Sequence, residues 1–199
     1  VTIEIPDTSL FQTGQKILQH GPGGKVDVKP RTTKQFVKLT PPGREDMMSD
    51  MECIKKALGP VKLDISVIRS LPHVLRSAQF NVTATTIDNR VIDVEPGNTT
   101  SKCCGVAFDI GTTTIVGTLV DLITGADLAV ASQINPQTSF GDDVISRIKR
   151  CRDDEKGLAE LQDSVLQAVN GIITKVLRES GVDRKSVYEA VFAGNTTMQ

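Results

Sequence analysis

In the second half of the chain, short apolar runs come first and apolar residues at helical spacing come afterwards. This pattern predicts strands followed by helices. Residues 105–110, 115–120 and 127–134 are short apolar runs rich in β-branched side chains, separated by small polar residues and glycine. Runs of this kind, joined by tight turns, are typical of an antiparallel meander. We therefore predict three successive paired strands in this part of the chain.

Two helices and a further strand are expected after the meander. The first helix opens near Gly141, with acidic residues at its positive end, and runs to about Cys151. A long amphipathic helix follows over residues 158–177, and Gly181 is its expected C-terminal cap. Residues 188–193 form the last predicted strand, which completes the order β-β-β-α-α-β. The side chains expected to point inward from the first helix are Val144, Ile145 and Ile148.

The first half of the chain predicts a smaller unit that contains two helices. Residues 47–58 have helical spacing, and Gly59-Pro60 ends that helix. A second, short helix begins near Ile65 and should stop before Pro72, because a proline disfavours the helical conformation of the residue before it. The methionines of the first helix are interpreted as core residues that fill gaps, namely Met47, Met48 and Met51.

The same unit is expected to contain a small sheet. Residues 34–39 have strand character, and residues 80–86 and 90–94 alternate around Asp88-Asn89, which predicts a hairpin turn. Glycine and proline clusters mark the borders of the unit. The expected organisation is a linker over residues 1–26, a small α+β middle domain over 27–97 and a third region over 103–199.

Composition narrows the classes of function. The 199 residues carry a formal net charge of -1, which argues against a nucleic-acid or membrane-surface partner. No apolar run approaches the roughly 20 residues that span a bilayer, and the N-terminus lacks the features of a signal peptide. The four cysteines show no metal-ligand spacing, which favours reduced thiols in a cytoplasmic protein. The chain begins at Val1 without an initiator Met, so we expect it to be a piece of a longer protein.

The turn after the first strand of the meander is the main candidate for chemistry. Gly111 allows the backbone to approach a ligand closely, and Thr112, Thr113 and Thr114 supply hydroxyl groups beside backbone N–H donors. Such a concavity can hold the phosphates of a nucleotide. Asp109 would repel phosphate, so its expected role is to hold Mg²⁺ or its waters. The alternative is a plain hairpin whose threonines are present for strand propensity.

Two further polar turns follow at the ends of later elements. Asn195 and Thr196 come directly after the last strand, where they could contact a γ-phosphate or simply form a strand-end turn. Asp142 and Asp143 could be helix N-terminal acids, or one of them could reach a ligand cleft. The β-β-β-α-α-β order around these turns fits, by fold analogy, the first lobe of an actin-like ATPase domain. Residues 103–199 are therefore expected to be the N-terminal part of such a domain, truncated at its end.

The motifs together resemble those of a particular family. The chain contains Phe108-Asp109-Ile110-Gly111-Thr112-Thr113-Thr114, then Asn135-Pro136-Gln137, then Gly141-Asp142-Asp143-Val144-Ile145-Ser146-Arg147-Ile148, and finally Gly194-Asn195-Thr196-Thr197-Met198. In this order they resemble the ATP-dependent reductive activators of corrinoid proteins. The upstream part agrees, since Ile5-Pro6 with Ser9-Leu10 is similar to the linker that follows a ferredoxin domain in that family. The resemblance covers essentially the whole chain.

The resemblance implies the fold, cofactors and partner of a larger protein. The fold class it implies is α/β, with an α+β middle domain beside part of an actin/sugar-kinase/Hsp70-like, ribonuclease H-like lobe. The cofactors are ATP and Mg²⁺, with a [2Fe–2S] cluster in an upstream domain, and the partner is a corrinoid protein reduced from Co(II) to Co(I). The chain lacks the C-x₄-C-x₂-C…C ligand pattern, so that cluster is not expected within it.

Two other functions stay open at the level of sequence. One is an actin-fold kinase for a small metabolite, and the other is a non-catalytic interaction or dimerisation module. A homodimer stays open as a partner beside the corrinoid protein. The second lobe of an ATP site is expected beyond Gln199. For that reason we expect the isolated chain to bind ATP weakly or not at all, which calorimetry can measure.

Overall fold

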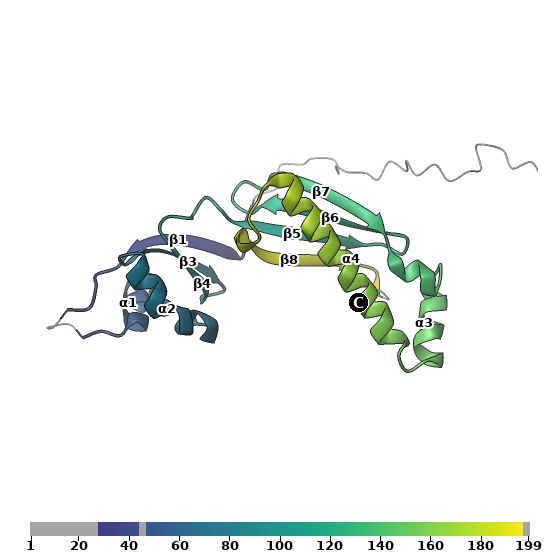
Figure 1. Cartoon of the computed structure of the whole chain (residues 1–199), viewed down its shortest axis with the longest axis horizontal. Coiled ribbons are helices and arrows are strands. Elements are labelled where there is room, and N and C mark those ends of the chain that lie inside the picture. Colours follow the sequence, from purple (N-terminus) through teal and green to yellow (C-terminus); the bar gives the residue numbers. More distant parts are fainter. Residues whose placement is uncertain (1–27, 44–46, 197–199) are drawn as a thin grey trace, which may run out of the picture.

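A computed structural model describes residues 28–43 and 47–196 of the chain. They form two bodies that lie next to each other, each built on one four-stranded mixed sheet with two α-helices (Figure 1). We call residues 28–96 the N-terminal body and residues 104–196 the C-terminal body. The linker expected over residues 1–26 lies outside the described residues.

The N-terminal body is a sheet with two helices packed on one side. Its sheet has the order β1-β3-β4-β2, and β3 and β4 form the predicted hairpin, with Asp88 and Asn89 at positive φ in the turn. Ile54, Leu71, Leu75 and Val82 are among the fully enclosed residues of its core. The elements are β1 (Thr32–Lys38), α1 (Asp50–Leu58), β2 (Lys62–Leu63), α2 (Ile65–Ser77), β3 (Asn81–Ile87) and β4 (Arg90–Pro96).

The helices of this body correct two of the predictions. Helix α2 does not stop before Pro72 but continues to Ser77, because Leu71 and Leu75 extend one buried face through the proline. Packing of that face outweighs the local preference of the residue before proline. Met47 is not a core residue: it lies before α1 and its side chain is 87% exposed.

The C-terminal body confirms the predicted order of strands and helices. Its elements are β5 (Cys104–Ile110), β6 (Thr114–Asp121), β7 (Asp127–Ile134), η2 (Pro136–Phe140), α3 (Val144–Asp153), α4 (Gly157–Ser180), η3 (Arg184–Ser186) and β8 (Val187–Gly194). The sheet has the order β7-β6-β5-β8, in which β5, β6 and β7 form an antiparallel meander and β8 pairs parallel to β5. Gly181 caps α4 in the left-handed conformation, as predicted.

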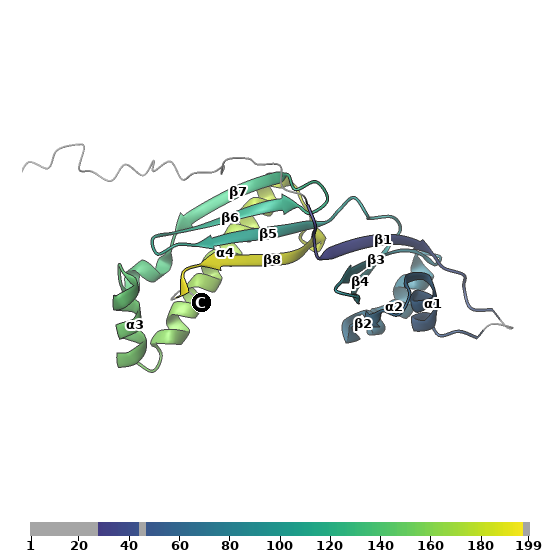
Figure 2. The ribbon, with the colours of Figure 1, turned by 180° about the vertical axis from the view of Figure 1, so that it is seen from behind.

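Helix α4 covers one face of this sheet and creates its core. Side chains that alternate along β5 and β6, such as Phe108 and Leu119, pack with Ile172 and Val176 of the helix. The intervening side chains, including Asp109, therefore point to the opposite face. Seen from behind, that face lies in front of α4, and no helix of the described part of the chain covers it (Figure 2).

Helix α3 is turned differently from the prediction. Ile145 and Ile148, expected to point inward, are 75% and 52% exposed, and the residue buried from this helix is Arg147. A buried guanidinium without hydrogen-bond acceptors would cost much free energy, so the rotation of the helix about its axis is set by the need to supply several acceptors. Arg147 finds them in the turns next to it, so the apolar side of α3 stays at the surface.

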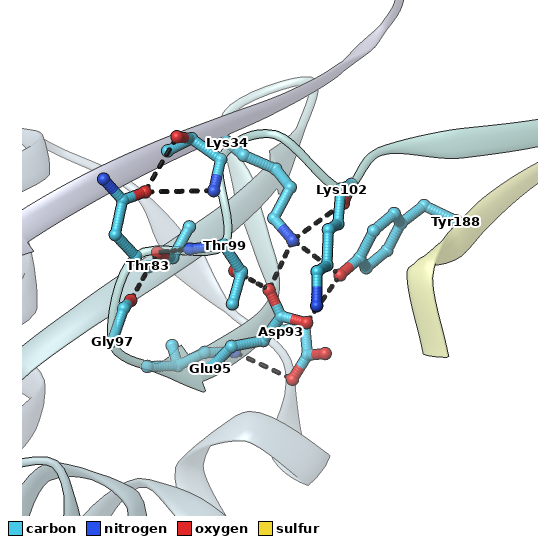
Figure 3. Close-up of polar contacts among 11 residues, drawn as sticks. Lys34, Thr83, Asp93, Glu95, Gly97, Thr99, Lys102 and Tyr188 are labelled. Atoms are coloured by element: carbon cyan, nitrogen blue, oxygen red, sulfur yellow. Dashed lines mark hydrogen bonds and ion pairs between the residues drawn. The ribbon is translucent and has the colours of Figure 1, made fainter. Parts of the chain in front are cut away.

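A buried polar cluster joins the two bodies. The ammonium group of Lys34 in β1 forms an ion pair with Glu95 in β4 and donates to the hydroxyl of Tyr188 in β8, at 3.0 Å, and to the carbonyl of Lys102, also at 3.0 Å (Figure 3). The Tyr188 hydroxyl donates to the other Glu95 oxygen at 2.9 Å. The Lys34 side chain is only 2% exposed, so its charge is stabilised by these partners rather than by water.

Candidate functional site

Three polar turns meet at one edge of the C-terminal sheet. Strands β5, β7 and β8 run in the same direction, and pairing places Ile110 opposite Gly194 and Thr114 opposite Ile134. The residues that follow these strand ends are therefore neighbours along the edge: the turn of residues 111–113 in the middle, Asn135 on one side and Asn195 on the other. The sequence motifs that looked separate come together here.

The turn between β5 and β6 is tight and leaves no room for a side chain at its first position. The N–H of Gly111 donates to the carbonyl of Thr114 at 3.0 Å. A Cβ atom on Gly111 would lie 2.6 Å from the same carbonyl oxygen, a distance that real Cβ atoms do not tolerate. Glycine is therefore required here by the closure of the turn itself, and close approach of a ligand is a second benefit of the same conformation.

Asp109 lies one residue before the end of β5, exposed on the face that α4 leaves open. In the described part of the chain, no three His, Cys, Asp or Glu side chains form a group that could hold a metal ion. A single carboxylate nevertheless suits Mg²⁺, which commonly takes one or two protein carboxylates and completes its octahedron with phosphate oxygens and water. The residues present therefore fit Mg²⁺ that arrives with a nucleotide.

Asn135 and Arg147 hold the turn from behind. The side-chain amide of Asn135, which is fully buried, donates to the Gly111 carbonyl at 2.8 Å, and its backbone N–H donates to the Thr113 carbonyl at 2.8 Å. The guanidinium of Arg147 donates to the Thr112 carbonyl at 2.6 Å. It also donates to the Gly141 carbonyl and to the side-chain oxygen of Gln137, each at 3.1 Å. Burial lowers the pKa of Arg147, and the charges of Asp142 and Asp143 partly oppose that effect.

The acidic pair before α3 divides between two environments. Asp143 is the N-cap of the helix, and its carboxylate accepts from the N–H of Ser146 at 2.7 Å and from the Ser146 hydroxyl at 2.6 Å. These two hydrogen bonds hold the pKa of Asp143 below its usual range. Asp143 thus acts as a helix N-terminal acid, while Asp142 is exposed beside it.

Sequence reasoning placed the Asp109–Thr114 turn and the Asn195–Thr196 turn but missed the role of Arg147. The apolar spacing of this helix predicts Val144, Ile145 and Ile148 on its inner side and does not include Arg147. No signal within the helix points to Arg147, because its acceptors at Gly141 and Thr112 lie in turns outside the helix. Asn195 and Thr196 are both exposed at the end of β8.

Two buried cysteines lie apart from the candidate site. Cys103 and Cys104 are buried at the start of β5, at the end of the strand opposite to Asp109. Burial raises the pKa of the Cys103 thiol to about 11 and that of Cys104 in the same direction. Within residues 28–43 and 47–196, no helix is both long and apolar enough to cross a membrane.

Comparison with known proteins agrees with the fold and the motifs. Residues 23–101 match the family model described as the RACo linker region, and residues 104–199 match the one described as the RACo middle region. The corrinoid activation enzyme RamQ of Eubacterium limosum is 40% identical over 111 residues, which is 55% of this chain and 19% of that protein. A solved structure of a reductive activator for corrinoid, iron–sulfur protein has a TM-score of 0.77 and 32% identity, covering 88% of this chain and 30% of the other.

The fold defines a mixed α/β protein with two sheets, and the polar edge of the second sheet is its candidate site. The chain carries the linker and middle regions of the RACo family, consecutively and in that order. The part expected above as a middle domain falls within the range of the family's linker region, and the match to its middle region covers residues 104–199. The chain spans less than a third of the length of either relative.

Proposed function

We propose that the polar edge of the C-terminal sheet binds the phosphates of ATP with Mg²⁺. The carrying observation is that the turn of residues 111–113 lies between Asn135 and Asn195 at the aligned ends of three strands. Strand ends of this kind expose backbone N–H groups, which favour an anion. Asp109 would hold Mg²⁺ or its waters, while Gly111, Thr112, Thr113 and Thr114 would contact phosphate oxygens, with Asn195 and Thr196 beside them.

We propose further that the protein containing this chain uses ATP to reactivate a corrinoid protein. The names of both relatives support this role, since one is a corrinoid activation enzyme and the other a reductive activator. In the proposed reaction one electron passes from a reduced [2Fe–2S] cluster in a separate domain to cobalt, which changes from Co(II) to Co(I). ATP would supply the free energy by favouring a conformation of the complex in which that transfer is possible.

The test is the Asp109→Ala substitution in the full-length protein. We expect Mg²⁺-dependent ATP affinity to fall about tenfold or more, because a direct or water-mediated metal ligand is lost. ATP-dependent formation of Co(I), followed by its absorption spectrum, should be lost, while the spectrum of the iron–sulfur cluster stays unchanged.

Asp127→Ala is the matched control for this experiment. Asp127 is also an exposed aspartate of the same sheet, but it begins β7 at the end remote from the turn. It should leave both ATP affinity and corrinoid reduction as in the unmodified protein. Unchanged ATP affinity in the Asp109 variant would remove Asp109 and this edge of the sheet from the nucleotide site.

A further inference from the structure

The hydrogen bonds that Asn135 and Arg147 donate to the turn of residues 111–113, which we call the phosphate turn, fix the direction of its N–H groups. Three successive carbonyl oxygens, those of Gly111, Thr112 and Thr113, each accept a hydrogen bond from Asn135 or Arg147. In a trans peptide the N–H of the next residue points away from the preceding carbonyl. Because these carbonyls point toward Asn135 and Arg147, the N–H groups of residues 112–114 point away from those two residues. We call this direction outward.

The outward N–H groups are available to a ligand. In the part of the chain that the structure describes, the N–H groups of Thr112 and Thr113 donate to no backbone or side-chain acceptor. Successive N–H groups that point into one concavity form an anion-binding nest. The nest is formed by the turn, but its direction depends on donors that lie outside the turn.

We infer that Arg147 and Asn135 are positioning residues for phosphate binding, because they fix the carbonyl groups of the turn and so aim its N–H groups at the ligand. This inference rests on the proposed function of the edge. Gln137 supports the arrangement: its oxygen accepts from Arg147, and its amide donates to the carbonyl of Leu161 in α4 at 3.1 Å. The guanidinium is thereby anchored to the long helix as well as to the turn.

The inference explains the two motifs that the phosphate turn alone does not need. Asn135 and Gln137 come from the Asn135-Pro136-Gln137 segment, and Arg147 comes from the segment that begins at Gly141. The side chains of Asn135 and Arg147 both donate to carbonyl oxygens of the same turn. By way of these bonds, their effect on a phosphate would act through the backbone of the turn.

The experiment compares ATP with AMP in the full-length protein. Arg147→Met keeps most of the side-chain volume and removes all hydrogen bonds that the guanidinium donates. We expect ATP affinity, measured by calorimetry, to fall about tenfold or more, while AMP affinity changes less than about twofold, because only the additional phosphates of ATP reach the turn. Hydrogen exchange of a peptide that contains residues 111–114 should become faster without nucleotide.

Arg150→Met is the matched control. Arg150 lies on the same helix, but its guanidinium pairs with Glu160 and does not contact the turn. It should leave the ratio of ATP to AMP affinity and the exchange of residues 111–114 as in the unmodified protein. If Arg147→Met does not fold, Gln137→Met gives the decisive measurement, with an expected loss of about threefold in ATP affinity alone.

The results separate this inference from the proposed function. If the unmodified protein binds ATP no better than AMP, the proposed phosphate site is wrong and the inference fails with it. If the unmodified protein prefers ATP and the folded Arg147 or Gln137 variant keeps the same ratio of affinities, only the positioning role is overturned. A fall in ATP affinity alone, with faster exchange in the turn, supports it.

Discussion

At the scale of single residues, Gly117 shows how closely β6 approaches α4. A Cβ atom at this position would lie 2.5 Å from the Cγ2 atom of Ile172 and 2.8 Å from the ring of Phe108. Its backbone is not in the left-handed region, so the need for glycine comes from packing alone. The absence of one methyl group therefore sets the distance between the sheet and the helix behind the candidate site.

Gly117→Ala should lower the free energy of unfolding by about 1–3 kcal/mol, because the inserted methyl group overpacks the core. Denaturant unfolding measures the change. Gly43→Ala is the control, since a Cβ atom at Gly43 meets nothing within 4 Å. Combining Gly117→Ala with Ile172→Ala should cost less than the sum of the two single changes, because the second change makes space for the first. Strict additivity would contradict the packing explanation.

At the scale of elements, the strands could be predicted from the sequence because their signals are local. Alternation and turn residues around Asp88-Asn89 and Gly111 are contained in the segments themselves, and the structure has strands where they indicate them. The orientation of α3 could not be predicted in this way. It depends on a contact between Arg147 and Thr112, which are 35 positions apart, and no periodicity within the helix reports it.

In the candidate site, too, one part can be predicted from the sequence and another part depends on the assembled fold. The glycine–threonine turn is visible in the sequence, because glycine and small polar residues follow an apolar strand. That Asn135 and Asn195 lie on either side of it depends on β7 and β8 running parallel to β5, which is a property of the assembled sheet. Which donors lie behind the turn is decided by tertiary packing.

Helix α2 continues through a proline at a cost that substitution can measure. Pro72 is in the helix interior, where it removes the hydrogen bond to the carbonyl four residues earlier. Pro72→Ala should therefore raise the free energy of unfolding by about 1–2 kcal/mol, the gain in helix propensity less the lost stiffness of the unfolded chain. Arg69→Ala, at an exposed position of the same helix, is the control and should change stability by less than about 0.5 kcal/mol. A lower stability of the proline variant would mean that the ring itself supports the helix.

At the scale of the whole molecule, the cluster of Lys34, Glu95 and Tyr188 makes the contact between the bodies dependent on pH. Burial alone would raise the pKa of Glu95, but hydrogen bonds from Lys34, Thr99 and Tyr188 outweigh it and lower the pKa. The stabilisation is therefore complete above the ordinary glutamate pKa of about 4.3 and is lost as the pH falls through the lower pKa of the folded state. Asp93, whose pKa burial raises, acts in the opposite direction.

Glu95→Gln isolates the contribution of this carboxylate from that of Asp93. At pH 7 the variant should be less stable by about 1–3 kcal/mol, because the bonds from Thr99 and Tyr188 become neutral ones and the buried ammonium of Lys34 loses its counter-ion. The difference from the unmodified protein should shrink as the pH falls below about 4. Urea unfolding across this pH range is the measurement. A difference that stays constant with pH would show that Glu95 does not titrate with the contact.

The path of the chain between the bodies limits how they can move. The first described residues of the N-terminal body contact the C-terminal body: the side chain of Val28 lies against Gly125, and the N–H of Thr32 in β1 donates to Glu189 at 2.8 Å. The covalent connection between the bodies runs separately, through residues 97–103 to β5. These contacts are non-covalent and can separate, whereas the segment of residues 97–103 cannot. Any rearrangement that opened the Lys34 cluster would therefore leave the N-terminal body tethered at this segment, which includes Lys102, whose carbonyl accepts from Lys34.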